Sequence, residues 1–436
     1  MENYSIVLII MSVMIGFSAI ADKIRIPYPV LMIAIGITIG FIPAIPNITI
    51  DPEVVFLIFL PPMLYDAAFN INFNEFKTHF NTISTLAIGL VFLTATGIAV
   101  AAYYLIPGMT WPLAFVLGSI LSATDAVAAI SITKGLGLSH KTSTILEGES
   151  LINDASALVA YKFAVAAVTG ITFIFWRASL DFAILMFGGL LVGFTLGKIL
   201  AFILSRVQKN NLVTIAFMLL MPFVTYQVAE ELNVSGVIAV VVLGLMISRF
   251  SNKVFPEHLK QQSRSFWDVI IFLLNGLIFI LIGLPFPDII RQMDHGTTGI
   301  YLGYALVITI VALALRMARV FLQQVNLEKA FQSKRRKITE HALLDFRTSF
   351  IISWSGMRGI VSLAIAIGLP TTLENGEPFP QRHIIIFISV AVVLFTLVGQ
   401  GLTLPWIVRK LRKEPVLKKV ETKIRQSSSK KISKNT

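Results

Sequence analysis

The feature that most constrains the fold is a succession of apolar segments of about 16 to 25 residues, separated by short polar breaks. A helix needs about 20 consecutive apolar residues to cross the hydrocarbon core of a bilayer. Hydrophobic residues make up 56% of the chain, charged residues make up 14%, and the mean hydropathy is +0.80. A globular domain has roughly 45–50% apolar and about 25% charged residues. The sequence therefore predicts an all-α polytopic membrane protein.

The apolar segments predict about 13 transmembrane helices. Lysine and arginine fall mainly in alternate connecting segments and in the C-terminal tail, whereas the opposite connecting segments hold only Arg177, Arg291 and Arg382. This asymmetry predicts an N-terminus outside and a C-terminus inside the cell. It also accounts for the net charge of +12 without a nucleic-acid partner. The expected spans are 5–21, 29–45, 53–71, 82–105, 111–134, 142–169, 179–204, 212–230, 234–249, 266–286, 298–321, 347–370 and 382–408.

Two of the predicted spans carry polar or weakly helix-forming residues near their middle. The fifth contains SATDAVA with Thr124 and Asp125, and the twelfth contains SWSGMRGIVS, in which glycines flank Arg358. Such residues favour broken helices whose ends face a cavity, although glycines can also serve close helix packing. Spans 5 and 12 are seven apart and so run in opposite directions. Spans 1–6 and 8–13 are therefore expected to form two inverted six-helix repeats, with the broken helices crossing at the membrane midplane.

The sixth span carries a polar face in EGESLINDASALVAY, residues 147–161. On a helix, Ser150 and Asp154 stack at i and i+4, and Glu149 and Asn153 stack one residue further round. An aspartate at the centre of a bilayer costs roughly 2.5–3.5 kcal/mol, so it must pair, take up a proton or bind a cation. The alternative is a satisfied buried polar network that only fixes helix packing.

A carboxylate that holds either a proton or a hard monovalent cation couples the two flows, which is antiport. Asp154 is the first candidate for this shared carboxylate. Ser150 on the same helix face, with Thr124 and Asp125 on the facing broken helix, are the expected co-ligands of a Na⁺ ion. Asn153 is expected to tether the two helices by hydrogen bonds.

The remaining charges within or beside the spans have less specific interpretations. Arg358 can neutralise one acid, and Glu149 is its expected partner because a guanidinium suits a bidentate carboxylate. Asp66 in LPPMLYDAAFN lies either on the ion's access path or near the membrane edge. Arg316 lies at the inner end of span 11, where snorkelling to the membrane surface explains it.

Several classes of protein are excluded by what the sequence lacks. It has no cysteine, so disulfides, thiolate metal sites and thiol catalysis are excluded. It also has no glycine-rich phosphate loop, HExxH or GxSxG motif. The chain is therefore expected to be a transporter and not an enzyme, with no cofactor and no nucleotide partner.

These residues resemble the cation/proton antiporter-1 family, the sodium/proton exchangers, in its bacterial branch. The ND pair within GESLIND and the arginine of MRG are the most specific matches. The similar blocks cover nearly the whole membrane region and occur in family order: IPYPVLMIAIGITIG, FLPPMLYDAAF, SATDAVAA, EGESLINDASALVAY, AEELNVSGVIAVVVLGLMIS, NGLIFILIG, SGMRGIVSLAIA and VGQGLTLPWIV.

The resemblance implies an antiporter membrane domain over residues 1–411, and the Lys- and Ser-rich composition of 412–436 predicts a short, basic, disordered cytoplasmic tail. It implies a homodimer, in which spans 1–3 and 7–10 form the dimer domain. Spans 4–6 and 11–13 would form a core that moves as an elevator and carries the ion. The expected dimer domain covers about 1–71 and 179–286, and the core about 82–169 and 298–408.

By motif match, the resemblance also implies roles for single residues. Asp154 would be the ion-and-proton carboxylate, with Asn153 as its companion and Ser150 as a ligand. Asp125 and Thr124 would be the partners on the broken helix. Family members with Asn-Asp at this position are associated with electroneutral, one-for-one exchange. The same match implies that Glu149 pairs with Arg358, and Asp66 departs from the Glu of many relatives.

The leading hypothesis is exchange of Na⁺, and also Li⁺, for H⁺ across a bacterial inner membrane, for Na⁺ and pH homeostasis. K⁺/H⁺ antiport is the alternative, because ligand types alone do not set the size of the cavity. A gated cation channel would pass current in proportion to voltage without coupling to protons. A sensor or scaffold derived from a transporter would bind cations without flux. Inverted broken helices favour a carrier over both.

Overall fold

The computed structural model describes residues 10–18, 28–42, 52–133, 136, 138–170, 175–291, 297–333, 343–373 and 376–411. Throughout these residues the regular elements are helices, apart from an isolated bridge between Thr372 and Pro378. Eight of the described helices are long and apolar enough to cross a bilayer. The predicted all-α polytopic class is confirmed.

Among the described residues, the first helical segment covers 10–18. The others are α2 (Tyr28–Gly40), α3 (Pro52–Asn70), α4 (Phe73–Ser84), the π-helix η1 (Thr85–Leu90), α5 (Val91–Leu105), α6 (Trp111–Ile120), α7 (Ala126–Thr133), α8 (His140–Val168), α9 (Phe175–Val207), α10 (Asn211–Glu231), α11 (Gly236–Val254), α12 (Glu257–Gly283), α13 (Phe286–Arg291), α14 (Thr298–Gln332), α15 (Phe346–Trp354), α16 (Ile360–Ile367) and α17 (Arg382–Leu411).

Both interruptions predicted from the sequence are present. The fifth predicted span divides into α6 and α7, and the twelfth divides into α15 and α16. Other boundaries differ from the prediction. The helix of the fourth span begins at Phe73 because its first turns are amphipathic, with Phe76 and His79 buried. α14 likewise continues past the predicted end of its span to Gln332. Positions 5–9, 19–21, 43–45 and 134 of the predicted spans, and the tail over 412–436, lie outside the described residues.

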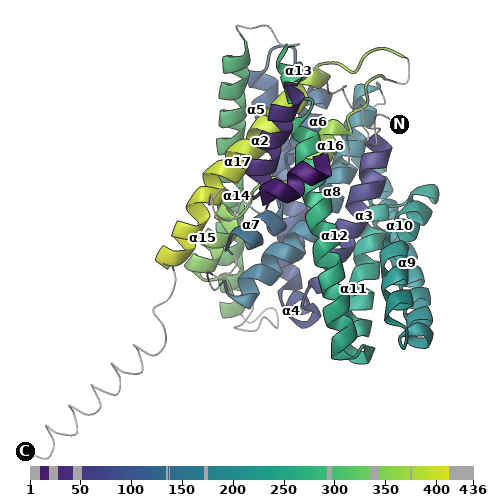
Figure 1. The fold of residues 1–436 in the computed structure, drawn as a ribbon. Coiled ribbons are helices and arrows are strands. Elements are labelled where there is room, and N and C mark those ends of the chain that lie inside the picture. Colours follow the sequence, from purple (N-terminus) through teal and green to yellow (C-terminus); the bar gives the residue numbers. More distant parts are fainter. Residues whose placement is uncertain are drawn as a thin grey trace, which may run out of the picture.

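The helices pack side by side, and α8 lies within the bundle. α11 packs against α9, α10 and α3, and α12 packs against α2. α14 packs against α5, α15 and α17, while α8 contacts α4, α6 and α7. In Figure 1, α9 and α10 lie along one edge of the bundle, and α14, α15 and α17 lie along the opposite edge. α7 and α16, one half of each broken helix, both pack against α17, and α7 also contacts α8.

Close approach of α2 and α12 depends on the Gly36-x-x-x-Gly40 pair. A Cβ atom at Gly36 would collide with the backbone of Ile280, and one at Gly40 would collide with the backbone of Leu284. Small residues allow this approach in membrane helices, where apolar packing replaces the hydrophobic effect as the source of association. The pair therefore serves helix packing and stands apart from the polar interior.

Candidate functional site

The two breaks meet each other in the middle of the bundle. The Asp125 amide donates to the Met357 carbonyl at 2.8 Å, and the Arg358 Nε donates to the Leu121 carbonyl at 3.0 Å. The break between α6 and α7 thus uses the break between α15 and α16 as its hydrogen-bond partner. Irregular backbone at membrane depth requires partners of this kind, because lipid offers none.

The charges in the breaks lie at helix ends of opposite polarity. The two oxygens of Asp125 accept hydrogen bonds from the Ala128 amide at 3.2 Å and the Ile360 amide at 3.5 Å. Its carboxylate therefore faces the N-terminal ends of α7 and α16. Arg358 faces the C-terminal end of α6 through the Leu121 carbonyl. Helix N-termini carry partial positive charge and C-termini partial negative charge, so both placements are stabilising.

The polar face of α8 is joined directly to the first break. The Ser150 hydroxyl donates to the Thr124 carbonyl at 2.9 Å and accepts from the Ala126 amide at 3.3 Å. The Asn153 amide nitrogen donates to the Thr124 Oγ1 at 2.7 Å. These bonds hold α8 in register against the loop that carries Thr124 and Asp125.

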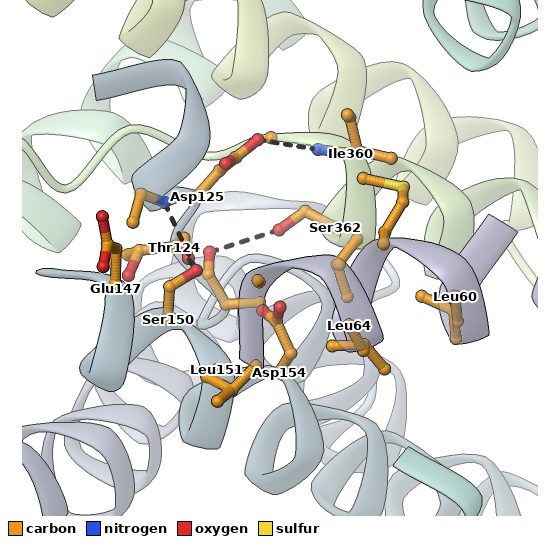
Figure 2. Close-up of a pocket in the computed structure, with 16 residues that line it drawn as sticks. Leu60, Leu64, Thr124, Asp125, Glu147, Ser150, Leu151, Asp154, Ile360 and Ser362 are labelled. Carbon is orange, nitrogen blue, oxygen red and sulfur yellow. Dashed lines mark hydrogen bonds between the residues drawn. The ribbon is translucent and has the colours of Figure 1, made fainter. Parts of the chain in front are cut away.

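A cavity of about 60 Å³ lies between α3, the first break, α8 and the N-terminal end of α16. Its volume is enough for a few water molecules, or for a cation that has shed part of its water. Figure 2 shows its labelled residues converging from these elements. The polar lining consists of Thr124, Asp125, Glu147, Ser150, Asp154 and Ser362.

The Asp154 carboxylate faces this cavity without a fixed partner in the part of the chain that the structure describes. Its side chain is 8% exposed, and among the described residues no group donates a hydrogen bond to its carboxylate. The opposite wall is apolar and comes from α3, with Leu60 and Leu64 shown in Figure 2. A buried carboxylate in such surroundings needs a proton or a cation.

Glu149 precedes Ser150 on α8, and its ion-pair partner differs from the predicted one. The predicted pairing of Glu149 with Arg358 is wrong: Arg316 of α14 binds both Glu149 oxygens, at 2.5 and 2.9 Å. Arg316 also donates to the Ile352 carbonyl in the last turn of α15. The interpretation of Arg316 as a snorkelling residue is wrong too, because its side chain is 1% exposed and points into the bundle.

The physical reason for the error lies in the broken helices. The last carbonyls of a helix that stops inside the bundle have no intrahelical partner. Arg358 is held by one such carbonyl, that of Leu121 at the end of α6, at 3.0 Å, and by the Gly356 carbonyl within the second break, at 2.9 Å. Its guanidinium is therefore used at the break, and Glu149 requires a cation from another helix.

Two further residues correct the expectations for the cavity. Glu147 lines it although it was not singled out as a site residue, and its spacing to Ser150 and Asp154 is i, i+3 and i+7. That spacing on one helix face was the available signal. Asp66 is not among the lining residues. It accepts a hydrogen bond from Asn70 at 2.8 Å, while its neighbour Ala67 lines the cavity.

The crossing of the breaks predicts a specific sensitivity to substitution at Gly359. A Cβ atom there would collide with the Asp125 side chain, so Gly359→Ala must displace either Asp125 or the start of α16. We expect a loss of about 1–3 kcal/mol in unfolding free energy, typical of overpacking. Gly399→Ala on α17 is the control, because a Cβ atom at Gly399 would have no atom within 4 Å. Equal melting temperatures for the two variants in detergent would contradict the described crossing.

The sequence of the chain is similar to those of a known protein family. Residues 7–410 match the family model described as "Sodium/hydrogen exchanger, transmembrane". The chain is 34% identical over 440 residues to a Bacillus pumilus protein named "Sodium, potassium, lithium and rubidium/H(+) antiporter". That match covers 99% of this chain and 65% of the relative, so the chain spans less than two thirds of the relative's length. It is 32% identical to the Na(+)/H(+) antiporter NhaH of Halobacillus aidingensis, covering 93% of this chain and 97% of that one.

The fold is also similar to a solved structure. The sodium proton antiporter MjNhaP1 from Methanocaldococcus jannaschii superimposes with a TM-score of 0.74 at 20% sequence identity. The match covers 95% of this chain and 99% of the other. At this identity the likeness establishes a common fold.

Proposed function

The chain belongs to the sodium/hydrogen exchanger family, a family of transporters, and we propose that it exchanges Na⁺, and also Li⁺, for H⁺ by alternating access. The observation that carries this proposal is the Asp154 carboxylate. It is buried, faces a small cavity beside two broken helices, and receives no hydrogen bond from the described residues. Such a group alternates between a proton and a cation because neither lipid nor a fixed partner neutralises it.

In the proposed cycle Asp154 binds the Na⁺ ion or the proton, and Ser150, Thr124 and Asp125 supply further oxygens. Hard cations bind oxygen ligands, and a few waters fit in the cavity beside them. Only a loaded carboxylate reorients across the membrane, so proton and cation movements are coupled. Asn153 holds Thr124 in place, and no cofactor takes part.

The charges around Asp154 support electroneutral, one-for-one exchange. The charge of Asp125 is directed at the N-terminal ends of α7 and α16, and that of Glu149 is matched by Arg316. Asn153, beside Asp154, is neutral. At the ion site itself one variable carboxylate, Asp154, remains, so one Na⁺ replaces one proton there; Glu147 lies seven residues away along α8.

We further propose that the chain forms a homodimer in the plasma membrane of a bacterial cell, with the N-terminus outside and the C-terminus inside. Thirteen spans would form two inverted six-helix repeats within a membrane domain over 1–411, followed by the tail over 412–436. The dimer domain would comprise about 1–71 and 179–286. The core would comprise about 82–169 and 298–408, and would move as an elevator. The packing of α11 on α9 and α10, and of α14 on α5 and α17, supports this division.

The elevator movement can be tested at an ion pair between the two proposed domains. The Lys162 Nζ of α8 lies 2.9 Å from the Glu230 Oε2 of α10. The sequence has no cysteine, so Lys162→Cys with Glu230→Cys introduces a unique pair. We expect a short bifunctional thiosulfonate to stop exchange and a reductant to restore it, because the link fixes the core to the dimer domain.

The matched control for this cross-link lies within the proposed dimer domain. The Asn211 Nδ2 of α10 donates a hydrogen bond to the Gln262 Oε1 of α12, also at 2.9 Å. Cross-linking Asn211→Cys with Gln262→Cys should leave the exchange rate unchanged. Full exchange by the linked 162–230 variant would contradict a relative movement of α8 and α10.

K⁺/H⁺ antiport is the second candidate, because the name of the Bacillus pumilus relative includes potassium. The test uses purified protein in liposomes that contain a pH-sensitive dye, with the membrane potential clamped. Gradients of Na⁺, Li⁺, K⁺ and choline are imposed in turn. We expect Na⁺ and Li⁺ to drive proton movement. A response to K⁺ alone would favour the second candidate, and no response to any cation would contradict antiport.

A further inference from the structure

Glu147 is an acidic residue of the cavity to which the exchange cycle above gives no role. It lies on α8 one turn before Ser150 and two turns before Asp154, and it lines the same cavity (Figure 2). Among the described residues, no hydrogen bond or ion pair engages its carboxylate, and its side chain is partly exposed. The facing wall, which includes Met63 and Ala67 of α3, is apolar.

The spacing along α8 separates Glu147 from the ion site itself. Seven residues of helix rise about 10.5 Å. Protein oxygens bind small cations at about 2.0–2.6 Å. Side chains on a helix lean towards its N-terminus, so the Glu147 carboxylate leans away from Asp154 and lies nearer to the N-terminal end of α8.

A merely structural role leaves its position unexplained. A carboxylate that fixes helix packing has a stable partner, as Glu149 has in Arg316. Asp66, the acid in this part of α3, is bonded to Asn70 and is not among the lining residues. Glu147 is an acidic side chain that lines the cavity and lies on α8 between the N-terminal end of that helix and Asp154.

We propose that Glu147 is the loading carboxylate, which first receives the cation and passes it to Asp154. This inference rests on the proposed exchange function and adds a residue that sets the apparent cation affinity. An acidic group in the wall of a low-dielectric cavity raises the local concentration of cations. A single charge about 10 Å from Asp154, at an effective dielectric constant of about 20, changes the cation affinity of Asp154 roughly tenfold.

The test is the dependence of exchange on Na⁺ concentration in proteoliposomes at fixed pH. For Glu147→Gln we expect roughly a tenfold rise in the half-saturating Na⁺ concentration, with a maximal rate close to that of the wild type. Glu147→Asp keeps the charge and should remain close to the wild type in both quantities. Glu257→Gln, which removes a charge from the exposed start of α12, is the control and should change neither.

The outcomes separate this inference from the function on which it rests. An unchanged half-saturating concentration in Glu147→Gln would overturn the loading role. Loss of exchange at every Na⁺ concentration, in a variant with a normal melting temperature, would also overturn it, because Glu147 would then belong to the ion site. Equal impairment of Glu147→Asp and Glu147→Gln would show that charge is not the cause. If Glu147→Gln does not fold, Glu147→Asn supplies the neutral side chain. Failure of the wild type to exchange would instead contradict the proposed function.

Discussion

Replacing Asp154 with asparagine is expected to reduce cation–proton exchange to the rate of empty liposomes while the protein remains folded. The amide has nearly the shape of the carboxylate but neither binds a proton in this pH range nor offers a charge to Na⁺. Since no described group donates to the Asp154 carboxylate, the substitution removes no hydrogen bond that holds the fold. Dye-reported proton movement under a Na⁺ gradient measures the loss, and the melting temperature in detergent measures the fold.

The matched control for this substitution is Asp181→Asn on α9. Asp181 is an exposed aspartate away from the cavity, so its neutralisation tests the effect of charge removal alone. We expect exchange at the wild-type rate. If Asp154→Asn retained wild-type exchange, Asp154 could not be the shared carboxylate.

The second large effect concerns the buried ion pair between Glu149 and Arg316. Both side chains are 1% exposed, so Arg316→Met leaves a carboxylate buried without its cation. Breaking a buried pair from one side costs about 3–5 kcal/mol. We expect a loss of this size in unfolding free energy, together with poor insertion or expression. Arg316→Met with Glu149→Leu should recover much of the loss, because an apolar replacement of both partners removes the uncompensated charge.

Two arginines serve as controls for this stability prediction. Arg319 lies one turn further along α14 and is partly exposed, so Arg319→Met should cost much less than Arg316→Met. Arg358→Ala should leave the ion pair between Glu149 and Arg316 intact. Any loss of stability in this variant should come from the Leu121 and Gly356 carbonyls, which lose their hydrogen-bond donor. Equal denaturation midpoints for Arg316→Met and Arg319→Met would contradict the pairing.

Much of the architecture is predictable from local sequence properties. Apolar length predicts the spans, and weak helix formers beside Asp125 and Arg358 predict both breaks. Helical periodicity brings Ser150 and Asp154 to one face, and both line the cavity in the structure. These features depend on spacing within one segment, so they need no knowledge of how the helices pack.

The partners of charged residues are less predictable, because they depend on rotation and depth of separate helices. Glu149 could face either Arg316 or Arg358, and the Leu121 carbonyl at the end of α6 helps to decide the outcome by engaging Arg358. A comparison of i and i+4 pairs alone does not identify Glu147. Its i, i+3, i+7 relation to Ser150 and Asp154 was present in the sequence.

The central claim is that one buried carboxylate couples Na⁺ to H⁺, and uphill Na⁺ movement tests it most directly. Wild-type protein is reconstituted in liposomes with equal Na⁺ on both sides, with the membrane potential clamped at zero and a pH gradient imposed. We expect radioactive Na⁺ to accumulate on the acidic side, against its own concentration, until its gradient balances the pH gradient. Na⁺ that only equilibrates across the membrane, whatever the pH gradient, would contradict coupled exchange and indicate a channel.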